Sequence, residues 1–277
     1  MPDLPSIAPL KVLHVIDHLG PGGAQQSLYV LLKNMDAARY PAAVAVLHGD
    51  GLYRKKLESL GVRVYGLSSR RLNPLLPMRL AEVIKSHQPH IVHTHLAVSC
   101  IMAAAESLRN KTFRMVSHVR SENQFRYSQA YLKGAHGWAN RRAWKIIAVS
   151  ARVRDFLIDD ERVSPGLISV IPNSFERMDE DAALVQAPRR HFGFFDDDQV
   201  AGCCARLDRN KGLEHLIGAL DILRTSRHFS LRIPCLRFNR QSAIGSWQLA
   251  PSPPHPTAAP ASSSSRGCSS ASWAPPV

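Results

Sequence analysis

Two histidines stand one residue apart in the segment His93-Thr94-His95, where an apolar run comes to an end. Side chains alternate along a strand, so we expect both imidazoles on one face of the sheet. A metal pair is one interpretation, but no third ligand follows at a spacing typical of a zinc site. The pattern therefore favours His93 and His95 as polar lining of a ligand cleft over a metal centre.

A further histidine, His118, comes near the end of the apolar stretch 113–119 and is followed by Arg120 and Glu122. A histidine in that place can donate or accept a hydrogen bond near neutral pH, which makes it a candidate for contact with a substrate. A structural histidine, with its ring satisfied inside the protein, is the alternative that this pattern leaves open.

Two cations, Arg206 and Lys211, flank the loop between an apolar run at 200–205 and an amphipathic helix at 212–224. Guanidinium and ammonium groups beside a helix N-terminus suit a diphosphate, because both neutralise charge on a leaving phosphate. A solvated basic loop is the alternative interpretation.

A glycine-rich turn, Gly20-Pro21-Gly22-Gly23, joins the apolar run Val12–Ile16 to an amphipathic helix that begins near residue 24. Glycine permits positive φ and leaves no side chain in the way of a ligand. The N-terminus of the helix adds backbone N–H groups and a positive dipole end, so the turn is a candidate anion site. The spacing falls short of the G-x-G-x-x-G dinucleotide fingerprint, and a purely structural turn is an equal alternative.

The elements that must position these groups alternate between strand and helix. Apolar runs that predict strands lie at 12–16, 42–47, 62–65, 90–93, 113–119, 146–149 and 167–171, and Ser150 is placed to cap a helix that begins at residue 151. Such runs are typical of a parallel sheet covered by helices on both faces. We predict an α/β, doubly wound sheet whose carboxyl edge gathers the loops at 20–23, 94–96, 118–122 and 173–175.

Changes in composition divide the chain into four segments. Residues 1–174 are predicted to form a first Rossmann-like domain, 175–198 to cross between domains, and 199–233 to begin a second, incomplete Rossmann-like domain. Residues 234–277 contain no aspartate or glutamate and are rich in proline, serine and alanine, which predicts a disordered tail. The tail is either natural or the product of a shifted reading frame, and the abrupt change in composition favours the shift.

The chain carries a formal net charge of +13 and has an isoelectric point near 10.0. This excess favours anionic partners such as nucleic acid, phosphorylated ligands or an acidic membrane face. Nucleic acid is the least favoured of these, because the basic residues are not interleaved with aromatic ones.

Five cysteines without a C-x-x-C pair indicate reduced thiols of a cytoplasmic protein. The first residues do not resemble a signal peptide, and no apolar run approaches the ~18 residues of a membrane span. We expect a cytoplasmic protein that at most docks on the inner face of an anionic membrane. The basic residues that could dock are Arg126, Lys133, Arg141, Arg142 and Lys145.

Six motifs in the expected order resemble those of the family 4 glycosyltransferases, which have the GT-B fold of two Rossmann-like domains. The motifs are VLHVIDHLGPGGAQ, IVHTHL, VSHVRSEN, IIAVSARVRDFL, VIPNSF and ARLDRNKGLEHLI, and the match runs over residues 11–224. The resemblance implies transfer of a hexosyl group from a nucleotide-sugar donor to a sugar or lipid-linked acceptor, with retention of anomeric configuration.

The resemblance also assigns roles to single residues. Gly22 and Gly23 would lie near the donor phosphates, and His118 would contact the donor sugar near the reacting centre. Arg206 and Lys211 would bind the diphosphate and stabilise it as the leaving group, so no metal and no cofactor are expected. The cleft would be lined on its acceptor side by His93, His95, Arg120, Glu122 and Asn173.

The chain departs from the family pattern in its second domain, because it has no acidic residue after Asp221. A Glu-x7-Glu segment, which in the family holds the donor sugar and ribose, is therefore missing, and we expect little or no transferase activity from this polypeptide. The alternative is a non-catalytic Rossmann-like module that binds an acceptor or a membrane surface. A nicotinamide-dependent oxidoreductase is disfavoured, because no acidic residue stands where a ribose would be held.

Overall fold

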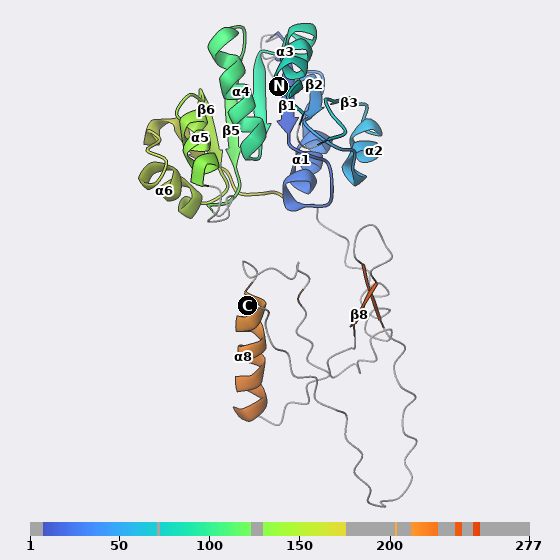
Figure 1. Ribbon diagram of the computed structural model, residues 1–277, viewed down its shortest axis with the longest axis vertical. Helices are drawn as coiled ribbons and strands as arrows, with labels where there is room; N and C mark the ends of the chain where they lie inside the picture. The colour runs from blue at the N-terminus through green and yellow to red at the C-terminus, as the bar shows by residue number, and fades with distance from the viewer. Residues whose placement is uncertain are drawn as a thin grey trace, which may run out of the picture. The chain divides into compact units, whose positions relative to one another are not determined.

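The protein is described by a computed structural model that covers residues 8–70, 73–122, 130–175, 203, 212–226, 236–239 and 246–249. The chain divides into two units, residues 1–178 and residues 179–277 (Figure 1). All the residues that the structure describes around the candidate site belong to the first unit.

One sheet of seven parallel strands forms the centre of the first unit, in the order β3-β2-β1-β4-β5-β6-β7. The order reverses between β1 and β4, which makes the sheet doubly wound, and the predicted α/β fold is confirmed. The strands are β1 (Val12–Ile16), β2 (Ala42–Val46), β3 (Arg63–Gly66), β4 (Ile91–His95), β5 (Arg114–Val119), β6 (Lys145–Ala148) and β7 (Ile168–Val170).

Helices connect the strands and cover both faces of the sheet (Figure 1). Crossovers between parallel strands are right-handed, so the face on which a helix lies depends on the direction in which the chain moves along the sheet. That direction changes after β3, and α1 and α2 therefore lie on one face while α3 to α6 lie on the other. The helices are α1 (Gly23–Asn34), α2 (Leu52–Glu58), α3 (Leu76–His87), α4 (Ala97–Arg109), α5 (Ala130–Asn140) and α6 (Ala151–Asp159).

Strand β2 contributes to two separate hydrophobic cores. Ala43 and Ala45 belong to the core that includes residues of α3 to α6, whereas Val44 and Val46 belong to the core under α1 and α2. Alternate residues of a strand point to opposite faces, so a strand between two helical layers is apolar at every position. This explains why the run at 42–47 shows no alternation of apolar and polar residues.

The strand register brings histidines from three strands onto one face. His14 of β1 stands opposite His93 of β4, and His95 of β4 stands opposite His118 of β5. Strand β4 extends through His95, two residues beyond the predicted end at residue 93. The difference arises because β4 pairs on both sides, and ladder hydrogen bonds extend a strand through polar residues that the local pattern assigns to a loop.

The second unit is described only in part. Helix α8 (Leu213–Ser226) occupies the range predicted for a helix at 212–224. Strands β8 (Leu236–Asn239) and β9 (Ser246–Leu249) form an antiparallel pair, within the segment for which we predicted a tail without secondary structure. Apolar residues at every second position of both stretches favour this strand pair. The strands predicted at 200–205 and 231–233 lie outside the described residues.

Among the helices that the structure describes, none combines the length and the apolar character needed to cross a membrane.

Candidate functional site

A pocket of about 470 Å³ lies at the carboxyl edge of the sheet. Because all seven strands run in the same direction, the segments that follow β1, β4, β5 and β7 meet at this edge. The lining comprises Gly23, Ala24, Gln26, Ser27, Leu96, His118, Arg120, Ser121, Asn173 and Ser174.

The predicted site residues divide into three groups. Those that line the pocket are Gly23, His118, Arg120 and Asn173. Those that the structure describes outside the lining are Gly22, His93, His95 and Glu122. Arg206 and Lys211, predicted to bind a diphosphate, lie outside the described residues.

The glycine turn places the N-terminus of α1 at the pocket. Gly22 is the N-cap residue, no side chain caps the helix there, and its first turn holds no acidic residue. The first N–H groups of the helix are therefore available to an anion. Gly22 does not use the positive φ that glycine permits, because its φ is 170°, which is extended backbone, and the described glycines with positive φ lie elsewhere. A Cβ on Gly23 would meet no atom within 4 Å, so the second property of glycine, room for a ligand, is what this position offers.

Sequence reasoning missed the first turn of α1 and the serines of two loops. Gln26 and Ser27 line the pocket because they follow the glycine turn by one helical turn. Their position in the sequence could have indicated this role, since a ligand at a helix N-terminus contacts residues near the start of the helix. Ser121 and Ser174 carry no such signal, because each depends on how a loop bends after its strand.

Helix α4 begins at the same edge and is held there by Asp17, which follows β1. The Asp17 carboxylate accepts a hydrogen bond of 2.8 Å from the backbone N–H of Ser99, in the first turn of α4. Burial raises the pKa of Asp17, and the hydrogen bonds from Ser99 oppose that rise. The N-cap residue of α4, Leu96, lines the pocket and has φ 78°, a left-handed conformation that costs a leucine free energy and is characteristic of functional sites.

Arg120, which follows β5, contacts one residue each of β4, of β5 and of the segment after β7. Its Nη1 donates to Oδ1 of Asn173, after β7, at 2.6 Å. Its Nη2 lies 3.3 Å from Nδ1 of His95 and 3.3 Å from Nδ1 of His118. Burial lowers the pKa of Arg120 to about 10, so the guanidinium remains charged at neutral pH.

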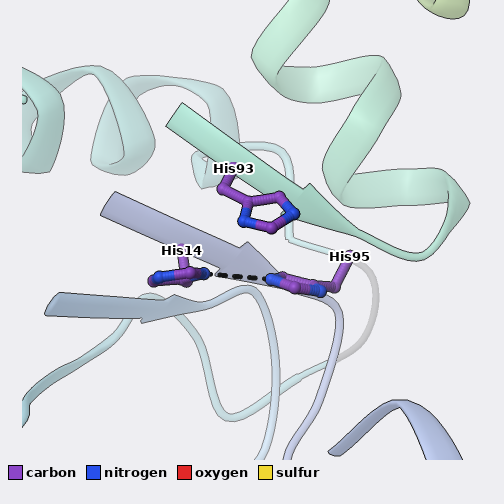
Figure 2. Close-up of side chains that lie close together, drawn as sticks. All are labelled: His14, His93 and His95. Carbon is purple, nitrogen blue, oxygen red and sulfur yellow. Dashed lines mark hydrogen bonds between the residues drawn. The ribbon is translucent and has the colours of Figure 1, made fainter. Parts of the chain in front are cut away.

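Three buried imidazoles, those of His14, His93 and His95, lie side by side on β1 and β4 (Figure 2). One nitrogen from each ring lies within 4.8 Å of the others, and Nδ1 of His14 is 3.1 Å from Nε2 of His95. The ring of His118 stacks on that of His93, with centroids 5.5 Å apart and an angle of 7° between the planes. His14 was not among the predicted site residues, because only the register of β1 against β4 places it beside His93 and His95.

These histidines are uncharged at neutral pH. Burial lowers the pKa of His14 to about 3, and burial lowers the pKa of His93 and of His95 well below the usual value. The pKa of His118 is also about 3, first because of burial and then because of the positive charge of Arg120. Neutral imidazoles are ligands that Zn²⁺ accepts, so the donor chemistry of the three buried rings suits a metal. The charge of Arg120, next to His95, opposes a second positive charge in that place.

Glu122, predicted to line the cleft, forms an ion pair with α6. Both of its carboxylate oxygens accept hydrogen bonds of 2.8 Å from Nε of Arg152, whose side chain is 81% exposed. The carboxylate is thereby held at the surface beside the pocket and is not part of its lining.

Comparison with models of protein families shows to which family this chain belongs. The model of the family described as Glycosyltransferase Family 4 matches residues 21–176, from the glycine turn to the segment after β7. The chain belongs to glycosyltransferase family 4. The predicted family is confirmed, and the matched range includes every described residue of the pocket lining.

Solved structures share the fold of this family 4 chain. Anabaena HepE in complex with UDP-glucose matches with a TM-score of 0.63 and 24% sequence identity, over 76% of this chain and 57% of that chain. A glycosyltransferase from Rickettsia africae matches with a TM-score of 0.57 and 17% identity, over 79% of this chain and 59% of that one. The family 4 chain thus spans less than two thirds of either protein, and no curated protein matches it.

Proposed function

We propose that this family 4 chain acts in the transfer of a hexosyl group from a nucleotide-sugar to a sugar or lipid-linked acceptor, with retention of anomeric configuration. The observation that carries the proposal is the composition of the pocket. An uncapped helix N-terminus, the guanidinium of Arg120 and the ring of His118 line one space of about 470 Å³. Family membership supports the same reading.

Each part of the lining has a role in this proposal. The N–H groups of α1 at Gly23 bind phosphate oxygens of the donor, because a helix N-terminus favours anions. The ring of His118 donates a hydrogen bond from Nε2 to an oxygen of the sugar. This nitrogen is buried and has no hydrogen-bond partner within the described part of the chain, so a ligand oxygen would satisfy it.

The second unit would supply the charges that stabilise the leaving group. Arg206 and Lys211 are the residues that we assign to the diphosphate, since a guanidinium and an ammonium together can offset its charge. The acceptor oxygen forms a bond to the anomeric carbon, the bond from that carbon to the diphosphate breaks, and the acceptor proton passes to the departing phosphate. With both cations in place the reaction needs no metal.

We also propose that the polypeptide of residues 1–277 has little or no transferase activity. Its sequence holds no acidic residue after Asp221, and carboxylates at the family's Glu-x7-Glu positions would hold the donor sugar and the ribose. Release of labelled sugar from a panel of nucleotide-sugars measures this directly. Turnover at a rate typical of enzymes, ~1 per second or faster, would contradict it.

Calorimetric titration of the full chain with UDP, GDP, ADP and their glucose conjugates tests the binding part of the proposal. We expect one nucleotide to bind, and His118→Gln to weaken binding of its sugar conjugate about 10-fold, the usual effect of one lost hydrogen bond. His87→Gln is the matched control, because His87 is half-buried and lines no part of this pocket. Failure of every nucleotide to bind would overturn the proposal.

Peripheral contact with an anionic membrane is a separate proposal. The charges that would carry it are Arg126, which lies outside the described residues, and four that also contact the protein itself: Lys133, Arg141, Arg142 and Lys145. Lys133, for example, pairs with Asp160 at 2.7 Å. Co-sedimentation with vesicles of acidic lipid should fall as salt is added, and sedimentation that salt does not change would contradict an electrostatic contact.

A further inference from the structure

The guanidinium of Arg120 can only donate hydrogen bonds, and this restricts the rings that it touches. Its Nη2 carries two hydrogens and lies 3.3 Å from Nδ1 of His95 and 3.3 Å from Nδ1 of His118. One hydrogen is available for each ring. Both Nδ1 atoms must then accept, so in a neutral ring the hydrogen is on Nε2.

The tautomer of His95 in turn sets the tautomer of a third ring, that of His14. Nε2 of His95 lies 3.1 Å from Nδ1 of His14. With its hydrogen on Nε2, His95 donates to Nδ1 of His14, and the hydrogen of His14 is also on Nε2. A single guanidinium thereby settles the tautomers of three imidazoles on three adjacent strands.

We propose that Arg120 is a positioning residue that holds His118 as the Nε2–H tautomer, so that His118 can act on a ligand only as a hydrogen-bond donor. The proposal rests on the proposed function for the identity of that ligand, a nucleotide-sugar or its acceptor. His118 lines the pocket, and its Nε2 is buried without a partner in the part of the chain that the structure describes. A neutral ring with hydrogen on Nε2 has no lone pair there, so His118 is not the base that removes the acceptor proton.

Asn173 fixes Arg120 for this task. Its Oδ1 accepts from Nη1 of Arg120 at 2.6 Å, and the residue lies three positions after the end of β7 at Val170. The guanidinium is therefore anchored on one side by an amide oxygen and presents its other NH₂ group to the two rings. Lysine in place of Arg120 would keep the charge but would lose the planar fork that reaches these acceptors together.

The same hydrogen bonds are incompatible with a metal bound at Nε2 of His95. A neutral imidazole that ligates a metal through Nε2 carries its hydrogen on Nδ1, and that hydrogen would point at the donors of Arg120. A metal held by His14, His93 and His95 would therefore have to displace Arg120 from His95. Tautomer control and metal binding are thus alternatives that one measurement can separate.

Nitrogen NMR of the histidine rings tests the proposal without any ligand. In the full chain labelled with ¹⁵N, long-range proton–nitrogen correlations report which ring nitrogen carries the hydrogen, and His95→Gln and His118→Gln assign the signals. We expect the Nε2–H tautomer for both rings in the wild type. Either ring found as Nδ1–H would overturn the proposal, and Zn²⁺ that shifts the signals of all three buried rings at stoichiometric amounts would favour the metal instead.

Arg120→Met tests the cause, because methionine keeps much of the apolar stem and removes every donor. We expect signals of both tautomers for His118 in this variant. Arg114→Met is the matched control, since Arg114 lies at the opposite end of β5, over the ring of Trp144, and its replacement should leave the tautomers unchanged. If Arg120→Met does not fold, Asn173→Ala, which removes only the anchor, is measured in its place. An unchanged tautomer in the variant would overturn the assignment.

Binding separates this inference from the proposed function. If a nucleotide-sugar binds, Arg120→Met and His118→Gln should each weaken it about 10-fold, and the double variant should weaken it little more than either one, because both remove the same hydrogen bond. Additive losses of about 100-fold would contradict a positioning role. If no nucleotide binds although the tautomers are as expected, the proposed function fails and the tautomer assignment stands.

Discussion

The carboxylate of Glu161 lies 2.8 Å from Nδ1 of His136, and the side chains are 1% and 2% exposed. The second carboxylate oxygen accepts from Nδ2 of Asn140 at 2.6 Å, and Oδ1 of Asn140 accepts from the hydroxyl of Ser117 at 2.7 Å. This buried network joins α5 and the end of α6 to β5, one residue before His118.

Removal of Glu161 should therefore destabilise the first unit strongly. Glu161→Ala removes the buried carboxylate to which Nδ2 of Asn140 donates and against which Nδ1 of His136 lies, and we expect a loss of about 3 kcal/mol in the free energy of unfolding. Urea unfolding measures it. Asp155→Ala is the control, because Asp155 pairs with Arg154 at the exposed surface and should cost no more than about 0.5 kcal/mol. Equal losses in the two variants would show that burial does not matter here.

Gly51 should be a position that tolerates no side chain. A Cβ on Gly51 would overlap the backbone of Leu19, whose carbonyl accepts from the N–H of Tyr53 at the start of α2. We expect Gly51→Ala to destabilise by about 2 kcal/mol, because backbone has to move. Gly134→Ala, on the exposed side of α5 with nothing within 4 Å, should instead stabilise by up to about 1 kcal/mol. Thermal melting of both variants checks the opposite signs.

Gly23→Ala should affect binding and leave folding unchanged. A Cβ there meets no protein atom within 4 Å, yet Gly23 lines the pocket at the N-terminus of α1. If phosphate oxygens approach these N–H groups, the methyl group should weaken binding of a nucleotide-sugar about 10-fold. Gly166→Ala, also in open space but outside the pocket, is the control. Unchanged affinity in Gly23→Ala would place the phosphates elsewhere.

Stability of the first unit should fall as the pH falls below about 6.5, the usual pKa of histidine. Burial lowers the pKa of His14 and of His118 to about 3, and lowers the pKa of His93 and His95 as well. Between the two pKa values the unfolded chain binds protons that the folded chain does not, so acid favours unfolding. Each ring contributes a slope of about 1.4 kcal/mol per pH unit in that window.

Urea unfolding at about pH 7 and about pH 5 measures this slope. His93→Gln removes one of the buried titrating rings and should make the slope shallower. Arg120 contributes a positive charge next to His95 and His118, and His93→Gln leaves that charge in place. A wild-type stability that is flat over this range would mean that the rings bind protons in the folded state as readily as in the unfolded chain, which would contradict the lowered pKa values.

The succession of strands and helices along the first unit, and the segment that reaches the pocket from the glycine turn, could be predicted from the amino-acid sequence. Apolar runs too short for helices, separated by amphipathic stretches, have few other ways to bury their surface. The helix cap at Ser150 was also predicted from the sequence, and its hydroxyl accepts a hydrogen bond from the backbone N–H of Val153. Family membership followed from motifs that are themselves local.

Which of these groups come into contact depends on the tertiary fold. His14 and His95 are 81 residues apart, and Arg120 and Asn173 are 53 apart, yet each pair forms a hydrogen bond. Alternation along a strand tells which residues share a face, but it does not tell which strands are neighbours or in what register they pair. Those two properties come from the crossovers and from both cores packing together. The neighbouring strands and their register bring residues that are distant in the sequence together, so that Arg120 is anchored by Asn173 beside the histidine rings and the pocket.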